Sequence, residues 1–398
     1  MKIEKALFKG GLILVVASGL FGLINFIFQL TMARMLSLSD YGILATLFSI
    51  FYILIVLMES IQTVIAKYTV EEKSDGRIKN ILKRALRKGA FGFIALFLIY
   101  LAVSIPLSQV LGIDYLLMTL NGLSILVVFS LPITRGILQG KKRFGALGTN
   151  LILESFFKLA IGVSLVYFGF SVAGALVGNL LGGILAFAFS FLPLMYLFSA
   201  KEKSRMTEGI YDYMKPSFVI SLVVVAFYSL DTIMAKIVFS AETAGIYAIA
   251  SIISKAAFWG TAPISKAMFP FSAEGRPGKN NFLSSAIVIT SFLLVVLLLI
   301  FLLLPDRIIS LFSGRSLPES ANILIYLGLS MGVLSLTNLI LLYKLSLNKV
   351  RGYWFLLFFL VIEAIVLFYS SGSLIVYSIS FLAVSVALLI YTILFVGN

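Results

Sequence analysis

Long apolar stretches, separated by short segments rich in charge, Gly or Pro, follow one another along the whole chain. Most exceed the ~20 residues that an α-helix needs to cross the hydrocarbon core of a bilayer. They predict helices at residues 8–33, 42–67, 86–112, 115–139, 145–169, 172–199, 216–239, 243–271, 282–304, 319–346, 351–370 and 373–396. The pattern therefore predicts an all-α polytopic membrane protein with about 12 transmembrane helices.

Two pairs of these stretches are separated by only a few residues. Gly169, Phe170 and Ser171 lie between two stretches of spanning length, and Ser371 and Gly372 lie between the last two. Gly and Ser favour turns rather than helix interiors. We therefore expect a tight hairpin at each place instead of one very long helix.

The composition supports a membrane location and limits the chemistry. Of 398 residues, 61% are hydrophobic and 12% are charged, and the chain contains no His and no Cys. A soluble domain has about twice this charge. Without imidazole or thiol groups there is no ordinary zinc, haem or thiolate chemistry. We expect no catalytic residues, no bound metal and no cofactor, and hence a protein that is not an enzyme.

The net charge of +14 reflects where the cations stand along the chain. Most Lys and Arg occupy connections that would lie on one side of a membrane, and this asymmetry marks the cytoplasmic side. It predicts an inner-membrane, multi-pass protein with both termini in the cytoplasm and no nucleic acid partner. The cytoplasmic set is Lys2, Lys5, Lys9, Lys67, Lys73, Arg77, Lys79, Lys83, Arg84, Arg87, Lys88, Arg135, Lys141, Lys142, Arg143, Lys201, Lys203, Arg205, Lys215, Arg276, Lys279, Lys344, Lys349 and Arg351; the opposite set is Arg34, Lys236, Arg307 and Arg315.

The basic connection 71–88 has apolar residues at helical spacing, at Ile78, Ile81, Leu82 and Leu86. Such a segment can form an amphipathic helix in an anionic headgroup layer. A solvated connector that carries topogenic charge explains it equally well, and both interpretations stay open at this stage.

The two halves of the chain resemble each other. Residues 32–45 (MARMLSLSDYGILA) match residues 234–248 (MAKIVFSAETAGIYA) with one insertion. The matched pairs are Ala33/Ala235, Arg34/Lys236, Asp40/Glu242 and Gly42/Gly245. The repeat predicts a six-helix lobe at 1–200, a cytoplasmic linker at 201–215 and a second six-helix lobe at 216–398. An even number of spans per half makes the lobes parallel repeats, as in transporters that bind substrate between two bundles.

Several segments resemble a known family. They are LSLSDYGILATLFSI (36–50), RGILQGKKRFGALGTNLILESFFKLAIG (135–162), SVAGALVGNLLGGILAF (171–187), FYSLDTIMAKIVFSAETAGIYAIASIISKAAF (227–258) and MFPFSAEG (268–275). The chain resembles the O-antigen-flippase-like polysaccharide (oligosaccharide-lipid) flippases of the multidrug/oligosaccharidyl-lipid/polysaccharide exporter superfamily. The resemblance implies alternating access by which a polyprenyl-diphosphate-linked oligosaccharide passes from the cytoplasmic to the outer leaflet for surface polysaccharide biosynthesis. It also implies contacts with membrane lipids and with glycan assembly machinery.

Ionisable side chains inside apolar spans are costly and tend to be functional. Seven stand within the predicted spans: Glu59, Glu154, Lys158, Asp231, Lys255, Lys266 and Glu363. Glu154 and Lys158 have the i, i+4 spacing of a pair on one helix face, so we expect them to be structural. Glu363, the repeat equivalent of Glu154, has no such neighbour. It is also expected to be structural, with a partner from another helix or a bound proton.

The other intramembrane charges lie on the first, second, seventh and eighth spans, which in the resembling family wall the space between the lobes. Cations exceed carboxylates there, and such an excess suits an anion such as a diphosphate. The predicted substrate-binding residues are Arg34, Lys67, Lys236, Lys255 and Lys266. For the three near span ends, Arg34, Lys67 and Lys236, snorkelling to the interface is the alternative.

Asp231 and Glu59 are the carboxylates of these spans. Carboxylates in membranes commonly relay protons or bind sodium, so each is a candidate for coupling by Na⁺ or H⁺. Pairing with a nearby Lys is the alternative for Asp231, and voltage alone is an alternative drive.

Three functions are compatible with the sequence: a lipid-linked oligosaccharide flippase, a cation-coupled multidrug exporter of the same superfamily, and a membrane assembly factor. A multidrug exporter should have a cavity dominated by carboxylates and aromatic residues, which the cationic excess disfavours. The closest approach to a phosphate loop, residues 136–141, has the wrong spacing for one. The flippase is the favoured interpretation.

Overall fold

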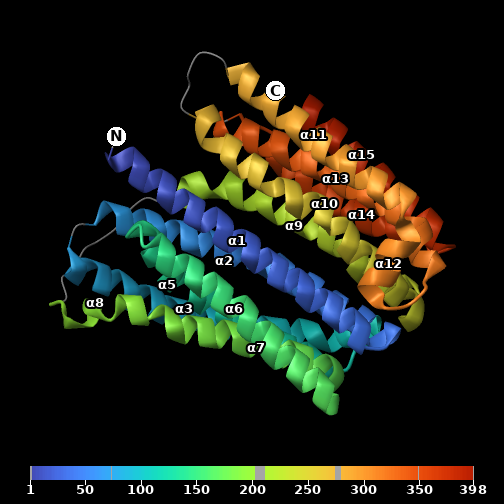
Figure 1. Ribbon diagram of the computed structural model, residues 1–398, viewed down its shortest axis with the longest axis horizontal. Helices are drawn as coiled ribbons and strands as arrows, with labels where there is room; N and C mark the ends of the chain where they lie inside the picture. The colour runs from blue at the N-terminus through green and yellow to red at the C-terminus, as the bar shows by residue number, and fades with distance from the viewer. Residues whose placement is uncertain (1, 73, 202–210, 274–278, 348, 398) are drawn as a thin grey trace. The chain divides into compact units, whose positions relative to one another are not determined.

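The computed structural model describes residues 2–72, 74–201, 211–273, 279–347 and 349–397, which form helices and no strands (Figure 1). The first half contains α1 (Lys2–Met35), α2 (Leu38–Glu71), α3 (Asp75–Leu111), α4 (Tyr115–Leu123), α5 (Ile125–Gly140), α6 (Phe144–Leu165), η1 (Val166–Phe170), α7 (Ser171–Ser190), η2 (Leu192–Leu194) and α8 (Tyr196–Ser199). The second half contains α9 (Tyr211–Val238), α10 (Ala241–Ala273), α11 (Lys279–Leu303), α12 (Pro305–Ser313), α13 (Pro318–Ser346), η3 (Tyr353–Phe355), α14 (Leu356–Tyr369) and α15 (Leu374–Leu394). The all-α prediction is confirmed for these residues.

By length and apolar composition, nine stretches of the described chain can cross a membrane. They are Leu12–Met35, Leu38–Val70, Asp75–Leu111, Tyr115–Gly140, Phe144–Leu194, Pro216–Val238, Leu283–Leu303, Pro318–Ser346 and Leu374–Leu394. A further apolar helix, Tyr353–Tyr369, is shorter. The chain is therefore a multi-pass membrane protein, and the count of about 12 spans stays a prediction.

The longest of these stretches, Phe144–Leu194, contains two helices that turn back on each other. The backbone leaves helical geometry at Gly169, with φ 91°, and at Ser171, with φ 45°. Beyond the turn, a Cβ on Gly174 would meet Leu165, one on Gly178 would meet Gly162, and one on Gly182 would meet Lys158. This order of contacts is antiparallel, so the hairpin predicted at Gly169 is confirmed. The glycines of α7 let the two backbones approach closely.

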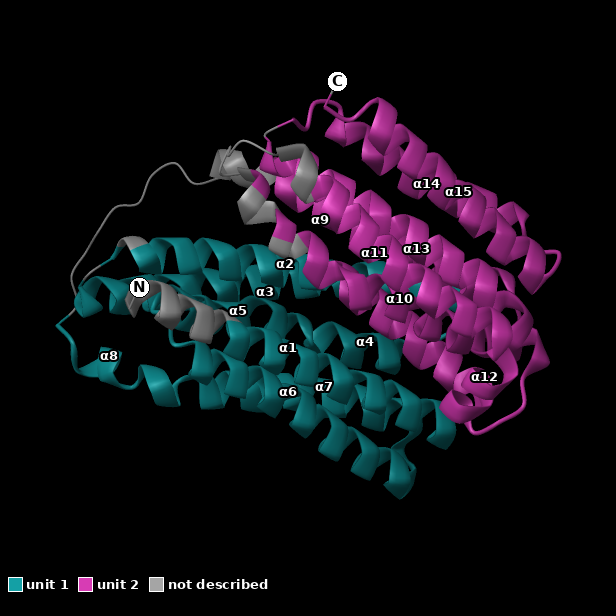
Figure 2. Cartoon of the chain, turned by 45° about the horizontal axis from the view of Figure 1, so that its top comes forward, with its two compact units in different colours: residues 1–36, 54–212 teal, residues 37–53, 213–398 magenta. Residues whose placement is uncertain are grey.

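The chain forms two compact units (Figure 2). Unit 1 comprises Met1–Leu36 and Leu54–Asp212, and unit 2 comprises Ser37–Ile53 and Tyr213–Asn398. The start of α2 thus packs with the second unit, a detail that the division into 1–200 and 216–398 does not contain. Most of the predicted linker, 201–215, lies outside the described residues, so the lobe boundaries remain predictions.

Within unit 2, the start of α2 lies against the start of α10. A Cβ added to Gly42 would meet the backbone nitrogen of Gly245, and a Cβ added to Gly245 would overlap the carbonyl of Leu38. Only glycine allows two backbones to come this close. Gly42 and Gly245 are matched positions of the predicted repeat.

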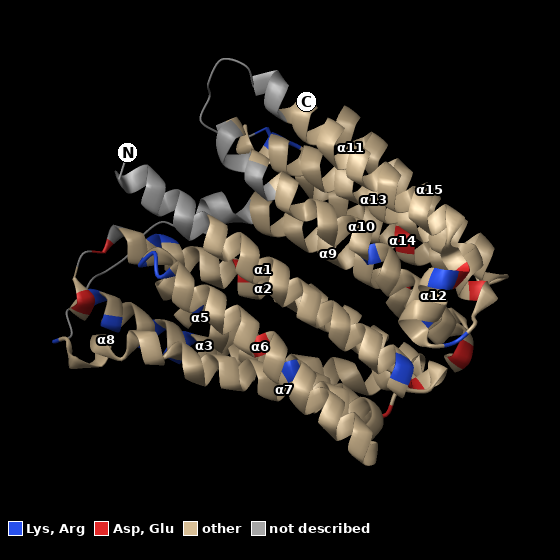
Figure 3. Ribbon diagram, viewed as in Figure 1, with Lys and Arg blue, Asp and Glu red and all other residues tan. Residues whose placement is uncertain are grey.

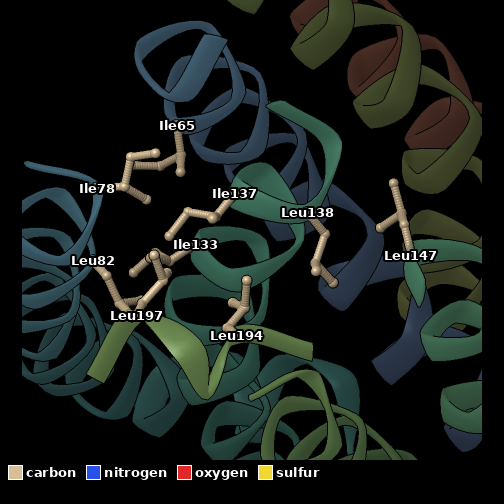
Figure 4. Packing of buried hydrophobic residues seen from close by; sticks show 9 residues of the cluster. All are labelled: Ile65, Ile78, Leu82, Ile133, Ile137, Leu138, Leu147, Leu194 and Leu197. Atoms are coloured by element: carbon tan, nitrogen blue, oxygen red, sulfur yellow. The ribbon is translucent and has the colours of Figure 1, made fainter. Parts of the chain in front are cut away.

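Within unit 1, a buried apolar cluster ties α2, α3 and α5 to the short α8 (Figure 4). Its members are Ile65, Ile78, Leu82, Ile133, Ile137, Leu138, Leu147, Leu194 and Leu197. Because Ile78 and Leu82 face this cluster, the apolar side of the basic segment 71–88 is covered by protein. Residues 75–88 of this segment form the first part of the long helix α3, and contact of its basic side with a headgroup layer stays a prediction.

Candidate functional site

A buried charged group of unit 2 is built around Asp231 of α9, whose side chain is almost fully buried. Its carboxylate accepts hydrogen bonds from Ser251 Oγ at 2.6 Å and Tyr247 Oη at 3.0 Å, both on α10. Thr232 Oγ1 adds a third at 3.1 Å. These neutral donors hold a carboxylate within an apolar bundle, where an unsatisfied charge would be costly.

Lys255 supplies the countercharge. Its Nζ lies 3.3 Å from Asp231 Oδ1 and donates to Thr232 Oγ1 at 3.1 Å. The Lys255 ammonium also lies 6.0 Å from the ring centroid of Tyr228. Only 2% of Lys255 is exposed. Its charge is therefore directed at Asp231 in this structure, rather than toward a surface from which a substrate could approach.

α15 and α14 complete the surroundings of this Asp231–Lys255 network. Tyr377 of α15 donates its hydroxyl to the backbone carbonyl of Asp231 at 2.6 Å. Glu363 of α14 is fully buried, and neither of its carboxylate oxygens has a hydrogen-bond partner. Glu363 is within electrostatic range of both Asp231 and Lys255. Asp231 of α9, Lys255 of α10 and Glu363 of α14 are therefore three ionisable groups in one buried region of unit 2.

No group of three or more acidic side chains that could hold a metal ion occurs in the described part of the chain. The oxygens of Asp231 accept hydrogen bonds from hydroxyl groups and an ion pair from an ammonium. A lysine thus occupies the position at Asp231 that a bound cation would otherwise need.

Unit 1 contains a second buried charged group, centred on Arg135 of α5. Arg135 Nη2 lies 2.6 Å from Glu154 Oε2 of α6, and Arg135 Nε donates to Asn150 Oδ1 at 2.7 Å. Asn150 in turn donates to the carbonyl of Ala186 on α7 at 2.6 Å. The Arg135 network therefore links α5, α6 and α7.

Sequence reasoning missed the burial of Arg135, because it assigned this residue to a cytoplasmic connection. Only 3% of Arg135 is exposed, and its neighbours Thr134, Gly136 and Ile137 are buried too. The signal was present, since Arg135 stands inside the predicted span 115–139 and is flanked by apolar residues on both sides.

Glu154 and Lys158, predicted as a pair, have different close partners. Glu154 makes its ion pair with Arg135. Lys158 Nζ donates to Asn25 Oδ1 of α1 at 3.0 Å and lies 4.7 Å from the ring centroid of Phe28. Glu154 still lies within electrostatic range of Lys158. Both residues take part in interhelical contacts of unit 1, and their structural role remains a prediction.

Replacing Arg135 by Met is expected to lower the thermal unfolding midpoint of the purified protein strongly. The variant leaves Glu154 without its ion pair and Asn150 without a donor, and breaking a buried ion pair costs about 3–5 kcal/mol. Lys142→Met, which removes an exposed cation two residues beyond α5, should leave the midpoint unchanged. Equal midpoints for both variants would refute the structural importance of the Arg135 network.

The remaining predicted residues lie on α1, α2, α9 and α10. Glu59 and Lys67 on α2 and Arg34 on α1 are exposed on unit 1. Figure 3 colours the acidic and basic segments, which are sparse along the helices. Lys236, at the end of α9, is only 7% exposed, and it has no hydrogen bond or ion pair among the described residues. Lys266 lies in α10, and its side chain is outside the described part. Among the described contacts of these predicted residues, the ion pair between Asp231 and Lys255 joins two of them directly.

The fold and the apolar helices that can span a bilayer define a multi-pass membrane protein. A model of the family described as "Polysaccharide biosynthesis protein" matches residues 7–276. The chain belongs to this family. The solved structures with a similar fold reported below are transporters and a flippase, not enzymes. No curated protein sequence matches the chain.

Solved structures with the same fold include both drug exporters and a lipid flippase. An inward-facing multidrug resistance MATE family transporter of the MOP superfamily has a TM-score of 0.74 at 14% identity, over 94% of this chain and 93% of that chain. The lipid II flippase MurJ in an inward closed conformation has a TM-score of 0.71 at 14% identity, over 96% and 87%. An outward-facing MATE transporter has a TM-score of 0.66 at 15% identity, over 98% and 94%. At such identities the likeness shows the fold alone.

Proposed function

We propose that the chain is a flippase that moves a polyprenyl-diphosphate-linked oligosaccharide from the cytoplasmic to the outer leaflet of the cell membrane by alternating access. The observation that carries the proposal is the match of residues 7–276 to the polysaccharide biosynthesis family. The similar fold of the lipid II flippase MurJ supports it, because that protein is also a flippase of a lipid. The chain would act beside glycan assembly machinery in the inner membrane, with both termini in the cytoplasm.

The diphosphate would be bound by the predicted cations Arg34, Lys67, Lys236 and Lys266, and by Lys255 when it is free. Lys236 is the most informative of these. A buried cation without a nearby anion destabilises a protein, so its presence requires a compensating role. Binding an anionic substrate group during transport is such a role, since Lys donates charge-assisted hydrogen bonds to phosphate oxygens.

The Asp231–Lys255 network would couple transport to a proton. A proton on Asp231 removes the charge that holds Lys255, and Lys255 is then free to turn toward an anion. Coupling by Na⁺ would require the metal ion to displace an ammonium that is already hydrogen-bonded. Glu363 is a second buried carboxyl in the same region and a candidate for the next proton position. Glu59, exposed on unit 1, remains the alternative coupling carboxylate.

A cation-coupled multidrug exporter is the second candidate, and the fold similarity to MATE transporters favours it. Transport by the purified chain in lipid vesicles separates the two. The flippase should speed the appearance of polyprenyl-diphosphate-linked oligosaccharide in the opposite leaflet and should not expel cationic drugs. The reverse selectivity would establish the exporter.

A further inference from the structure

Two helical hairpins of the chain expose aromatic side chains where they turn. Between α6 and α7 these are Tyr167, Phe168 and Phe170, and between α14 and α15 they are Phe368 and Tyr369; each is more than half exposed. Tyr167 packs edge-to-face on Phe168 with ring centroids 5.8 Å apart, and Phe368 meets Tyr369 in the same way at 5.6 Å. Unit 1 and unit 2 therefore each contain one aromatic turn, residues 166–171 and residues 367–373 respectively.

The lengths of the helices place both aromatic turns at the edge of the hydrocarbon core. α7 has 20 residues and α15 has 21, so each rises about 30 Å from its turn, which equals the thickness of the core. Cationic side chains mark the far ends. Arg143 donates to the carbonyl of Pro193 beyond α7, and Lys344 donates to the carbonyl of Ile393 near the end of α15 at 3.0 Å. Since such cations reach the polar boundary of a bilayer, the aromatic turns lie at the opposite boundary.

Neither aromatic turn carries a charged residue. No Asp, Glu, Lys or Arg occurs between Lys158 and Lys201, and none follows Glu363. Four other helices, α2, α4, α10 and α12, have an acidic residue at their start: Asp40, Asp114, Glu242 and Asp306. Charged connections favour water, whereas an uncharged turn with aromatic side chains is suited to the interfacial layer of a membrane.

Both aromatic turns are tight and partly closed by their own contacts. Ser370 Oγ donates to Ser380 Oγ at 2.8 Å, and Ser373 Oγ accepts a hydrogen bond from the backbone nitrogen of Val376 at 3.2 Å. In the other hairpin, α7 begins at Ser171 directly after η1 ends at Phe170, so no loop residue stands between them. Polar groups that are satisfied within the protein tolerate a layer that contains little water.

The aromatic pair of unit 2 also continues a lipid-facing side of α14. Val361, Ile365 and Phe368 are each more than half exposed and follow one another by four and three residues, which places them on one face of the helix. In a membrane-spanning helix such an exposed apolar face contacts acyl chains. The aromatic residues are thus the last members of a face that is already in contact with lipid.

We propose that the two aromatic turns bind the interfacial layer of a phospholipid leaflet, between the headgroups and the acyl chains, and fix the depth of their hairpins. The phenyl rings enter hydrocarbon, and the Tyr hydroxyl groups stay on the hydrated side. The occupant is lipid rather than a second copy of the chain, because the turns lie at boundary depth and continue a lipid-facing side. The proposal is independent of which substrate the chain transports.

Tryptophan fluorescence of the full-length chain in bilayers tests the depth of the aromatic turns. Trp259→Phe with Trp354→Phe removes both natural tryptophans, and Tyr167→Trp or Tyr369→Trp then places a reporter in one aromatic turn. Phospholipids with a nitroxide at the headgroup, high on the acyl chain or at the chain end quench at three depths. We expect the two upper labels to quench these reporters most strongly. Iodide in the buffer should quench them several-fold less than Ser316→Trp, an exposed position between α12 and α13.

A second set of variants tests whether the aromatic pair fixes the depth of its hairpin. The reporter is Ile365→Trp, one helical turn inside the aromatic turn of unit 2. Replacing Phe368 and Tyr369 by Ser should increase its quenching by iodide and by the headgroup label. Exchanging the two rings, Phe368→Tyr with Tyr369→Phe, keeps the aromatic content and should leave the quenching unchanged. If Tyr369→Trp disturbs folding, Phe368→Trp reports on the same turn.

Four results would overturn the proposal. Iodide quenching of the turn reporters equal to that of Ser316→Trp would place the turns in water, and strongest quenching by the chain-end label would place them in the hydrocarbon core. Protection from iodide that disappears when the protein is diluted with lipid would assign the turns to contacts between copies of the chain. Unchanged quenching at position 365 after the Ser changes would show that the aromatic pair does not set the depth.

Discussion

Asp231→Asn is expected to destabilise the protein by about 3–5 kcal/mol, because it leaves the Lys255 ammonium buried without a countercharge. The double variant Asp231→Asn/Lys255→Met removes both charges and should recover most of this stability. Thr232→Val removes only a neutral hydroxyl from the same network and should cost about 1 kcal/mol. Thermal or denaturant unfolding of the four proteins, wild type included, measures these differences.

The same variants distinguish an effect on folding stability from an effect on the coupling of transport to a proton. If Asp231 takes up the coupling proton, the stable double variant should lose the dependence of transport on a pH gradient, while Thr232→Val should retain it. A double variant that transports with an unchanged pH dependence would exclude the network from coupling. A single Asp231→Asn variant as stable as the wild type would show that the ion pair is not buried as described.

Lys236→Met is expected to raise the unfolding midpoint and, at the same time, to reduce transport of the lipid-linked diphosphate at least about tenfold. The stability gain follows because an apolar side chain replaces a cation that is 7% exposed and has no ion pair among the described residues. The loss of transport follows because hydrogen bonds to charged groups contribute about 1.5–3 kcal/mol. Opposite changes in stability and activity are typical of residues retained for function.

Lys344→Met is the matched control. Lys344 of α13 donates to the carbonyls of Thr392, Ile393 and Val396 at the end of α15, at 2.7, 3.0 and 2.5 Å. Removing it should lower stability and leave the transport rate per folded molecule unchanged. Arg34→Ala, at an exposed position, should reduce transport with little effect on stability. If Lys236→Met lowers stability or leaves transport intact, Lys236 is not a substrate-binding residue.

The helices could be predicted from the sequence because membrane spans are specified locally. Each needs only about 20 apolar residues and a polar boundary. The turn at Gly169 was visible for the same reason, since a glycine between two spans permits the positive φ that the structure contains.

The partners of the charged residues could not be predicted in the same way. The i, i+4 rule paired Glu154 with Lys158, whereas the ion pair of Glu154 reaches Arg135 on another helix. Asp231 and Lys255 are 24 residues apart and meet because α9 packs against α10. This packing decides whether Asp231 pairs with a lysine or is available to a coupling Na⁺ or H⁺, so the sequence left both alternatives open.

Transfer between the leaflets of reconstituted vesicles is the most direct test of the central claim, that this chain is a lipid-linked oligosaccharide flippase. Vesicles with the wild-type chain should transfer a polyprenyl-diphosphate-linked oligosaccharide at least about tenfold faster than empty vesicles, and Lys236→Met vesicles should lose most of this excess. The rate should rise with a pH gradient. Transfer no faster than in empty vesicles, together with proton-driven movement of a cationic drug, would contradict the claim and identify an exporter instead.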